Sequence, residues 1–369
     1  MRPEEATARP SALWVTGSGP HADIVISSRI RLARNLSVTP FPHVLSAEGA
    51  EDVVRRVETA FKALQAEGRL KDHTFVRVDQ LPPLNRQVLV EKHLISPQHA
   101  QEDKPTALIT DPEQTVSVMV NEEDHLRIQC LLPGLQLEKA WAMANAMDDA
   151  LEEKLDFAFG ERLGYLTACP TNVGTGLRAS VMLHLPALIL TNQAARVGHA
   201  VVKLGLAIRG LYGEGTEALG NMFQVSNQVT LGQTEEEIID NLHGVTEQLV
   251  SNETNARKFL MSENRSQIED RVNRAYGTLA NARIMSSQEA MQLFSDLRLG
   301  VDLDLLHLRR KKTLNELMVV TRPAYLQQLA GGELEPLQRD IRRASLIRET
   351  LRLTDLPPTG EPGGDQKTR

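Results

Sequence analysis

Two neighbouring runs in the first half of the chain alternate hydrophobic and polar positions. In residues 115–121, valines occupy every second position, and residues 126–132 form another β-rich run. A period of two residues is typical of a half-buried strand. The segment between the runs is short enough for an antiparallel hairpin. We therefore expect the carboxylates of residues 122–124 to lie at the tip of this hairpin.

Other segments have the period of a helix. Apolar residues recur every three or four positions over 137–159, which predicts an amphipathic helix. Thr234 is followed by three glutamates in the manner of a capping box, and the helical pattern then continues to about Leu353. This change of pattern predicts an α+β domain and then an all-helical one. The expected divisions are a flexible N-terminus over 1–22, the α+β domain over 23–257, the helical domain over 258–353, and a disordered tail over 354–369.

Composition and charge exclude several classes of protein. The chain of 369 residues is 41% hydrophobic and 24% charged, which is typical of soluble globular proteins, and its net charge of −7 gives no general attraction for nucleic acid or an anionic membrane. Cys130 and Cys169 stand outside any zinc-spaced cluster, so we expect neither a disulfide framework nor a metal held by side chains. Neither a secretion signal nor an apolar run of ~18 residues is evident. We expect a cytoplasmic protein without a membrane or nucleic-acid partner.

Arginines stand in several compact motifs that could neutralise a triphosphate. A planar guanidinium donates parallel hydrogen bonds and keeps its proton, and phosphoryl transfer needs such neutralisation. A single arginine is more often an ordinary surface charge, but the chain has no Walker A lysine for the same task, and the set carries more weight than its members. The arginines concerned are Arg29, Arg31, Arg127, Arg178 and Arg209.

Acidic residues and a cysteine could serve an acceptor that carries a guanidinium. Carboxylates can align such a group and remove its proton. The run Glu122-Glu123-Asp124 could equally be a solvated turn, and Cys169 could be an inert buried thiol. The residues around them, Asn121, His125-Leu126-Arg127 and Pro170-Thr171-Asn172, make a specific chemistry the better interpretation.

Together these motifs resemble the phosphagen kinase family, whose members transfer the γ-phosphoryl group of ATP to a guanidinium. The resemblance implies an α+β catalytic domain over 23–257, with an antiparallel sheet flanked by helices, and MgATP as the phosphoryl donor. It implies that Glu123, Glu214 and Cys169 are catalytic. It also implies an ATP site made of Ser27, Ser28, Arg29, Ile30, Arg31, His93, Arg127, Arg178, Ala179, Ser180, Val181, Met182, Arg209, Gly210, Leu211, Tyr212, Gly213 and Glu214. Met182 stands where many members have a histidine near the adenine.

The C-terminal helical part resembles that of the bacterial protein-arginine kinases. Arg339-Asp340-Ile341-Arg342-Arg343-Ala344 matches their RDxxRA motif, which implies an allosteric phosphoarginine-binding site in a dimer-forming domain. Arg339 and Arg343 share a helix face, so both could hold one phosphate while Asp340 meets a guanidinium, although six such residues could also be an ordinary charged surface. The implied partners are protein substrates with exposed arginines, a second copy of the chain, an activator protein and the Clp unfoldase and protease, which degrade the marked proteins.

Three alternative functions fit the sequence less well. A kinase for free arginine or another guanidino metabolite is disfavoured, because only about twenty residues precede the first motif, where such enzymes carry a helical domain. A non-catalytic phosphoarginine-binding adaptor is disfavoured by Glu123, Glu214 and Cys169. Residues 174–179 also fit the GxGxxA dinucleotide pattern, but no strand runs directly into the first glycine, which disfavours an oxidoreductase.

Overall fold

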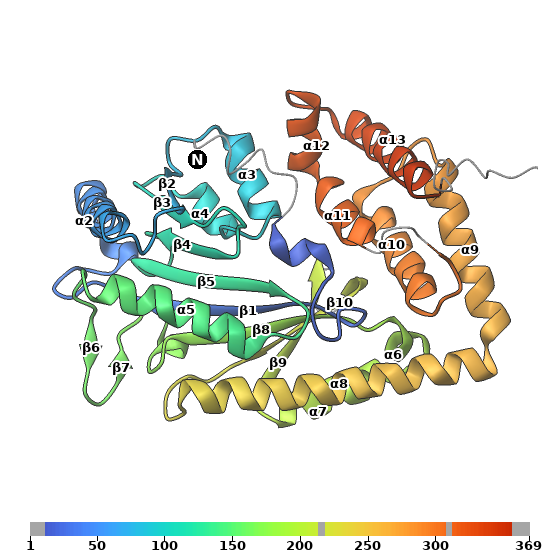
Figure 1. Cartoon of the computed structure of the whole chain (residues 1–369), viewed down its shortest axis with the longest axis horizontal. Coiled ribbons are helices and arrows are strands. Elements are labelled where there is room, and N and C mark those ends of the chain that lie inside the picture. The colour runs from blue at the N-terminus through green and yellow to red at the C-terminus, as the bar shows by residue number, and fades with distance from the viewer. Residues whose placement is uncertain (1–11, 213–217, 308–311, 356–369) are drawn as a thin grey trace, which may run out of the picture.

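A computed structural model describes residues 12–212, 218–307 and 312–355. Its centre is an eight-stranded sheet of order β2-β3-β4-β5-β1-β8-β10-β9, in which every neighbouring pair is antiparallel (Figure 1). The strands are β1 (Val25–Arg34), β2 (Thr74–Arg77), β3 (Ala107–Thr110), β4 (Val116–Val120), β5 (Leu126–Pro133), β8 (Leu177–His184), β9 (Leu206–Tyr212) and β10 (Ala218–Asn227). A separate small hairpin joins β6 (Phe159–Gly160) to β7 (Gly164–Tyr165).

Helices cover both faces of the sheet and form the C-terminal part. The α-helices are α2 (Ala47–Ala66), α3 (Pro83–Glu91), α4 (Pro97–Gln101), α5 (Leu137–Glu152), α6 (Pro186–Leu190), α7 (Ala194–Lys203), α8 (Glu235–Glu263), α9 (Arg265–Asn281), α10 (Ser287–Asp302), α11 (Lys312–Val320), α12 (Pro323–Ala330) and α13 (Pro336–Asp355). Short 3-10 helices are η1 (Leu13–Thr16), η2 (Pro42–Val44) and η3 (Pro170–Asn172). The predicted α+β fold, with a flanked antiparallel sheet and helices after it, is confirmed.

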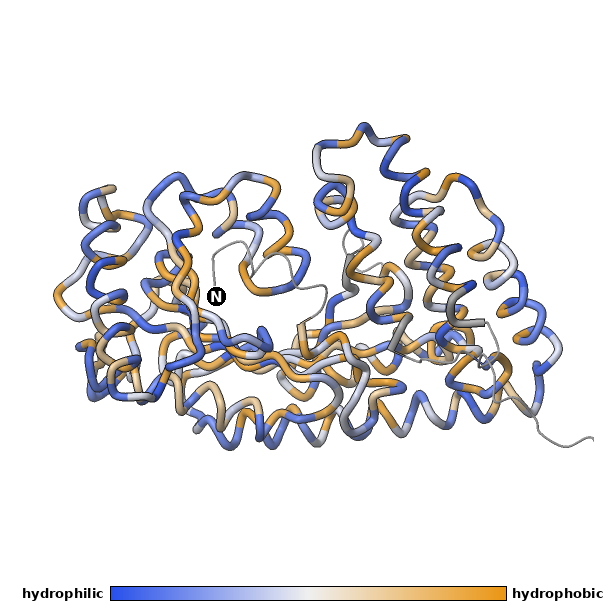
Figure 2. Tube along the Cα trace, turned by 45° about the horizontal axis from the view of Figure 1, so that its top comes forward, coloured by the Kyte–Doolittle hydropathy of each residue, from blue (hydrophilic) through white to orange (hydrophobic). Residues whose placement is uncertain are grey.

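The pleat of the sheet separates a hydrophobic face from a polar one. Ile30 and Leu32 of β1 are fully buried in the main core, which includes residues of α2, α5, α7 and α8. Each buried side chain of this kind stabilises the fold by roughly 1.5–3 kcal/mol. Figure 2 shows that hydrophobic residues are concentrated in the central strands. Arg29 and Arg31 alternate with these residues, so they project from the opposite face.

Local patterns predicted several element boundaries. The β4–β5 hairpin is confirmed, and so is the capping box of α8, in which Thr234 Oγ1 accepts from Glu237 N at 3.2 Å and Glu237 Oε2 accepts from Thr234 N at 3.0 Å. The predicted helix over 137–159 is too long, because α5 ends at Glu152. Residues 156–158 instead pair with the segment after β1, where Ala158 N donates to Asn35 O at 2.7 Å.

Regular structure begins nearer the N-terminus than the composition of residues 1–22 predicts. Residues 1–11 lie outside the described ranges, but η1 places Trp14 and Val15 at 4% and 1% exposure against Ile26 and Leu131. Trp14 Nε1 also donates to the carbonyl of Lys92 at 3.3 Å. The segment 12–16 therefore packs on the polar face of the sheet.

Helix α8 runs along the sheet and leads directly into the helical part (Figure 1). It passes through residue 257, where the sequence places a domain boundary that stays a prediction. Arg257 itself pairs with Glu253 at 3.0 Å and with Asp23 at 3.3 Å, and the Glu253 carboxylate accepts from the first amides of α6 at 3.0 Å. Polar contacts therefore join α8 to Asp23, which precedes β1, and to the start of α6.

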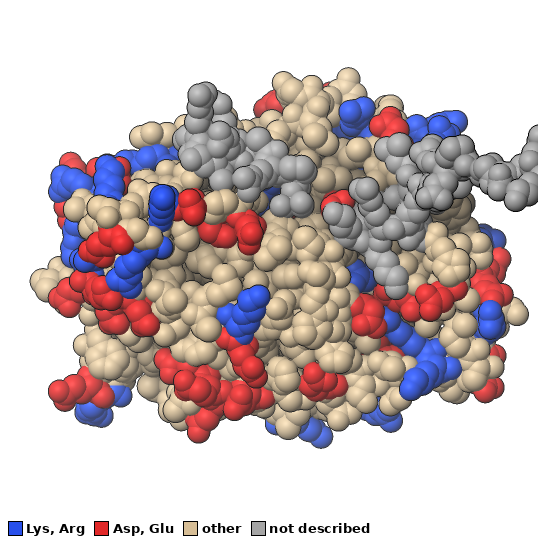
Figure 3. Space-filling model, viewed as in Figure 1, with Lys and Arg blue, Asp and Glu red and all other residues tan. Residues whose placement is uncertain are grey.

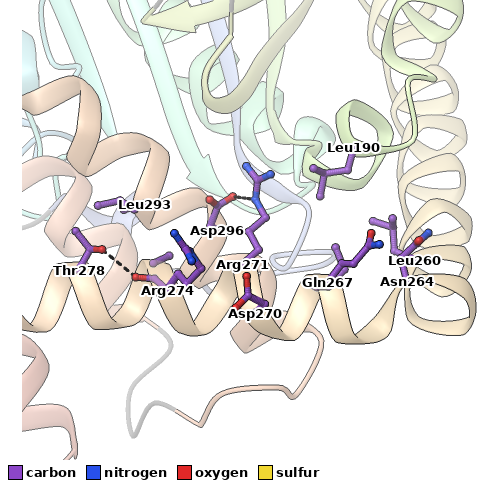
Figure 4. Close-up of a pocket in the computed structure, with 12 residues that line it drawn as sticks. Leu190, Leu260, Asn264, Gln267, Asp270, Arg271, Arg274, Thr278, Leu293 and Asp296 are labelled. Carbon is purple, nitrogen blue, oxygen red and sulfur yellow. Dashed lines mark hydrogen bonds and ion pairs between the residues drawn. The ribbon is translucent and has the colours of Figure 1, made fainter.

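A cavity of about 600 Å³ lies where α9 passes α6 and α10 (Figure 4). Arg271 lines it and pairs with Asp296 at 2.8 Å. Acidic and basic side chains are mixed on the face seen in Figure 3. Among the residues described, every helix is too short or too polar to cross a membrane.

The close contact between α9 and α10 gives a stability prediction. A Cβ added at Gly300 of α10 would overlap with Val272 Cγ1 of α9. Gly300→Ala should therefore lower the free energy of unfolding by roughly 1–3 kcal/mol, although alanine favours helix, because the core becomes overpacked. Urea denaturation measures the change.

Gly277→Ala in α9 is the matched control, because a Cβ there meets no described atom within 4 Å. This variant should keep its stability or gain up to ~1 kcal/mol from helix propensity. Equal stabilities of the two variants would contradict the close helix contact.

Candidate active site

The arginines predicted for the nucleotide lie on one face of the sheet. Strand register places Arg31 of β1 opposite Arg178 of β8, and it places Arg127 of β5 opposite Ala33. Arg29 donates from Nε to Ser180 Oγ at 3.3 Å and from Nη2 to Gln224 Oε1 at 3.0 Å. Arg209 of β9 is exposed and lies opposite the same Gln224. Strands far apart in the sequence thus contribute to one cationic surface, which we call the arginine face.

The arginine face gathers like charges that are incompletely compensated. Burial lowers the pKa of Arg31, and the charges of Arg29, Arg127 and Arg178 lower it further. Burial also lowers the pKa of Arg178, with Arg209 as the next cause. The Nε atoms of Arg31 and Arg178 are buried without a hydrogen-bond partner among the described residues. Arginines keep their protons, so such a cluster favours binding of a polyanion.

The β4–β5 hairpin, which we call the acidic hairpin, carries residues 122–124 between its strands. Its two glutamates differ in exposure. Glu122 has a side chain only 2% exposed and accepts from Ser96 Oγ at 2.6 Å, whereas the Glu123 side chain is 38% exposed. Burial raises the pKa of Glu123, against the opposing effect of Arg127. Of the two glutamates, Glu123 is therefore the one that can reach a substrate.

Arg127 connects the arginine face to these acids. Its Nη1 lies 2.6 Å from Glu122 Oε2, and its Nη2 donates to Glu123 Oε2 at 3.0 Å. From the sequence, Arg127 is expected only to contact phosphate. In the structure it also orients the glutamate that the sequence predicts to be catalytic.

The segment that carries Cys169 lies beside the acidic hairpin. Ala168 N donates to Asp124 Oδ1 at 2.7 Å, and Cys169 Sγ, which is partly exposed, lies 3.0 Å from Thr171 Oγ1. A cavity of about 590 Å³ is bordered by Glu123, Ala168 and other residues of this region. The predicted thiol and the accessible carboxylate therefore belong to one corner of the sheet.

Close packing explains Gly176 in the segment after Cys169. Its φ is +65°, and a Cβ would lie 2.6 Å from Arg34 Nη1 and 2.7 Å from Ala33 O. Arg34 is itself buried, pairs with Asp148 at 2.6 Å and stacks on the Tyr165 ring at 3.4 Å. The glycine therefore lets the segment approach the end of β1.

Part of the predicted nucleotide set faces away from the arginine face. Ile30, Ala179 and Val181 are fully buried in the opposite, hydrophobic core. Ser28 Oγ donates to Gly134 O at 2.8 Å on that side, while Ser27 is buried opposite Met182. Motif matching selects consecutive residues, whereas a strand sends alternate side chains to opposite faces.

His93 and Met182 lie at the other end of the arginine face. The pKa of His93 is lowered to about 3, chiefly by burial and in addition by the charges of Arg322 and Arg29. Its ring meets Trp14 edge-on, with centroids 5.1 Å apart, and Met182 packs on the cluster that contains Trp14. Sequence reasoning missed Trp14 because it lies in the predicted flexible segment. The short apolar run Ala12-Leu13-Trp14-Val15 within a polar, Pro-rich stretch is the signal that could have identified it.

The second predicted acid falls outside the described residues. Gly213 and Glu214 lie there, so the structure does not place them. Gly210 lies opposite Phe223, and β9 ends with Leu211 and Tyr212.

The C-terminal motif lies on α13, and Arg343 within it is 1% exposed. Arg343 Nε donates to Thr321 O at 2.8 Å, and its Nη1 donates to Met285 O at 2.8 Å and to Asp340. Arg339 donates to Leu334 O at 3.0 Å, Arg342 is exposed, and Ala344 is buried. The predicted sharing of one phosphate by Arg339 and Arg343 thus has to compete with bonds inside the protein.

Comparisons with known proteins agree along both parts of the chain. Residues 52–256 match the family model described as ATP:guanido phosphotransferase, C-terminal catalytic domain, and residues 265–361 match that of the protein-arginine kinase McsB C-terminal domain. The chain is 57% identical to the protein-arginine kinase of Moorella thermoacetica, over 92% of this chain and 97% of the relative. It is 55% identical to that of Symbiobacterium thermophilum, over 94% and 98%.

Solved structures show the same fold. A lombricine kinase aligns with a TM-score of 0.55 and 27% identity, over 65% of this chain and 68% of that one. A duplicated taurocyamine kinase from Schistosoma mansoni aligns with a TM-score of 0.58 and 24% identity, over 73% and 39%.

His125, next to the acidic residues, gives a pH prediction. Its Nδ1 accepts from Leu36 N at 3.0 Å, and its Nε2 lies 2.9 Å from Pro40 O, which fits a neutral ring protonated at Nε2. Burial lowers its pKa from 6.5 to about 4. The unfolded chain therefore binds this proton at higher pH than the native chain, and the residue's contribution to stability is complete above 6.5 and decreases as the pH falls toward 4.

NMR of ¹⁵N-labelled histidine should show His125 neutral in the folded protein at about pH 6. A folded-state titration midpoint near 6.5 would contradict the buried hydrogen-bond arrangement.

Proposed function

The chain belongs to the protein-arginine kinase family of ATP:guanido phosphotransferases, and on this premise we propose that it transfers the γ-phosphoryl group of ATP to arginine side chains of proteins. One observation carries the proposal. The accessible carboxylate of Glu123 and the Cys169 segment lie at the edge of an arginine face with unused buried donors. A polyanion and a guanidinium could therefore bind side by side.

The arginine face binds the nucleotide in this proposal. Arg29, Arg31, Arg127, Arg178 and Arg209 neutralise the triphosphate, with Ser180 supporting Arg29. His93, Met182 and its strand neighbour Ser27 lie toward the nucleoside, while Ser28, Ile30, Ala179 and Val181 face the core and support the strands that carry the arginines. Charge on the moving phosphoryl group is stabilised most in the transition state.

Glu123 aligns the acceptor guanidinium and removes its proton as the new N–P bond forms, while the bond from the γ-phosphorus to the bridging oxygen of ATP breaks and ADP leaves. A raised pKa suits a general base, because a more basic carboxylate takes the proton more readily. Glu214 supplies a second carboxylate from the segment after β9, and Cys169 lies against the acceptor. Arg127 bonds to Glu123 and could also contact the phosphate, which brings donor and acceptor together.

Mg²⁺ enters with the nucleotide as part of the substrate. Among the described residues, the groups of His, Cys, Asp and Glu include none that could hold a metal ion. Bound to phosphate oxygens, Mg²⁺ supplies charge neutralisation. The arginine face orients this complex and neutralises its remaining charge.

The acceptor is an arginine within a protein rather than a free metabolite. The C-terminal match to a protein-arginine kinase domain and the names of relatives above 50% identity support this choice. We further propose that the enzyme acts as a homodimer in the cytoplasm, where ATP is available, that an activator protein controls it, and that the product marks proteins for Clp-type degradation.

The RDxxRA motif forms the allosteric phosphoarginine site in this proposal. Arg339, Asp340 and Arg342 would meet the ligand, while Arg343 and Ala344 hold α13 in place. A chain of contacts connects the motif, through α12, with the residues around His93. Arg343 binds the carbonyl of Thr321, and the following helix α12 is capped by Glu91, two residues before His93.

Incubation with MgATP tests the function directly. A protein rich in exposed arginines should acquire phosphate that acid releases, because the N–P bond is acid-labile, and free arginine should acquire much less. Acid-stable phosphate, or preference for free arginine, would contradict the proposal.

Glu123→Gln tests the catalytic role. The amide keeps the size of the side chain but loses the base, so turnover should fall by ~10²-fold or more with little change in ATP affinity. Glu122→Gln is a useful comparison, since its buried side chain should act through the hairpin conformation and lower thermal stability as well. Near-normal turnover of Glu123→Gln would exclude it as the base.

Calorimetry with free phosphoarginine tests the regulatory site. Arg339→Ala and Arg342→Ala should each weaken binding by ~10-fold or more, because each removes a charge-assisted contact. Arg352→Ala, an exposed arginine of the same helix, is the control and should bind normally. Equal affinities in all three variants would reduce the motif to a charged helix surface.

A further inference from the structure

Asn35, directly after β1, lies where three segments of the candidate site meet. Its side-chain Nδ2 donates to Asp124 Oδ1 at 2.7 Å and to Leu166 O at 3.0 Å. Its Oδ1 accepts from His125 N at 2.9 Å. The residue is 1% exposed, so these bonds are formed away from solvent. Use of both donor positions and the acceptor fixes the orientation of the amide.

Asp124 extends this network to the cysteine segment. It is fully buried, and the same Oδ1 that accepts from Asn35 also accepts from Ala168 N at 2.7 Å. Asp124 follows Glu123 in the chain, and Ala168 precedes Cys169. One carboxylate oxygen therefore joins the neighbour of the proposed base to the neighbour of the proposed thiol.

We infer that Asn35 and Asp124 are positioning residues that hold Glu123 and Cys169 in register around the acceptor guanidinium. The inference rests on the proposed function, which gives Glu123 and Cys169 their roles. Glu123 and Ala168 border the adjoining cavity, whereas Asn35 and Asp124 are absent from its described lining. Both residues therefore act through their neighbours.

The surrounding backbone makes this point of the fold rigid. Asn35 O accepts from Ala158 N at 2.7 Å, and the next residue, Leu36, donates from its N to His125 Nδ1 at 3.0 Å. A movement of the hairpin would therefore break hydrogen bonds to Asn35 or Leu36. Displacement of a reacting group by ~1 Å can cost ~10²-fold in rate, so this rigidity has kinetic value.

Asn35→Ala tests the inference by separating turnover from nucleotide binding. Turnover should fall by ~10- to 100-fold, while ATP affinity stays within ~3-fold, since the arginine face is not altered. Asn315→Ala is the matched control, because Asn315 is a buried asparagine of α11 that accepts from Arg298 far from the acidic hairpin. A loss of turnover no greater than that of the control, or a parallel loss of ATP affinity, would overturn the inference.

A measurement without turnover separates this inference from the proposed function. Alkylation of Cys169 by iodoacetamide should change by ~3-fold or more in Asn35→Ala, because the bonded cysteine segment is released, and it should stay normal in Asn315→Ala. An unchanged alkylation rate in Asn35→Ala would overturn the positioning role. Normal turnover of Glu123→Gln would instead remove the proposed base, whatever the alkylation rate.

Two further variants distinguish positioning from direct chemistry. Asp124→Asn keeps an Oδ1 that can accept from Asn35 and Ala168, so it should retain turnover within ~5-fold, whereas a catalytic carboxylate would lose ~10²-fold. In a Glu123→Gln background, Asn35→Ala should cost less than ~3-fold, because alignment of the base no longer matters. A ~10²-fold loss in Asp124→Asn or fully multiplicative losses in the double variant would contradict the inference.

Discussion

The gathering of several guanidinium groups on one face of the sheet is the constraint on which the rest of the structure depends. Like charges at this density repel one another, and this repulsion adds to burial, the larger cause, in lowering the pKa values of Arg31 and Arg178. The cluster persists because the other face of the same strands is fully buried hydrophobic core. Burial of that core fixes β1, β5 and β8 in register, and the register then places the arginines. The hydrophobic core on one face thus holds the mutually repelling arginines together on the other.

Two buried carboxylates away from the arginine face accept hydrogen bonds from backbone amides at the start of a helix. Glu253 pairs with Arg257 and accepts from the first amides of α6, while Glu91 accepts from Ala324 N and Tyr325 N of α12, each at 2.8 Å. Burial raises the pKa of both acids, and the amides and arginines oppose that effect. A carboxylate at a helix N-terminus is stabilised by the helix dipole and the unpaired N–H groups. Each of these two helices therefore begins where a buried acid holds it.

Local patterns predicted the elements well and the direction of side chains less well. The alternation of β4 and β5 and the capping box at Thr234 depend on neighbouring residues, so the sequence could identify them. The end of α5 depends on the pairing of residues 156–158 with the segment after β1, which no local pattern contains. Family motifs located Glu123 and Cys169, but they also included Ile30, Ala179 and Val181, which face the core. The network of Asn35 was missed because its three partners lie far from it in the sequence.

The helical part contacts the catalytic fold through α10, where Ser295 bonds to His184 and Asn221, and through α12. Arg322, the residue before α12, is the second cause of the lowered pKa of His93, and Glu91 caps the helix that follows. Trp14 lies between these features, because its ring meets His93 and its Nε1 binds the carbonyl of Lys92. A shift of α12 would have to break the bonds to Glu91 and move a charge past His93. The end of the candidate site at His93 is therefore tied to the C-terminal helices, while the end at Glu123 depends on Asn35 and the acidic hairpin.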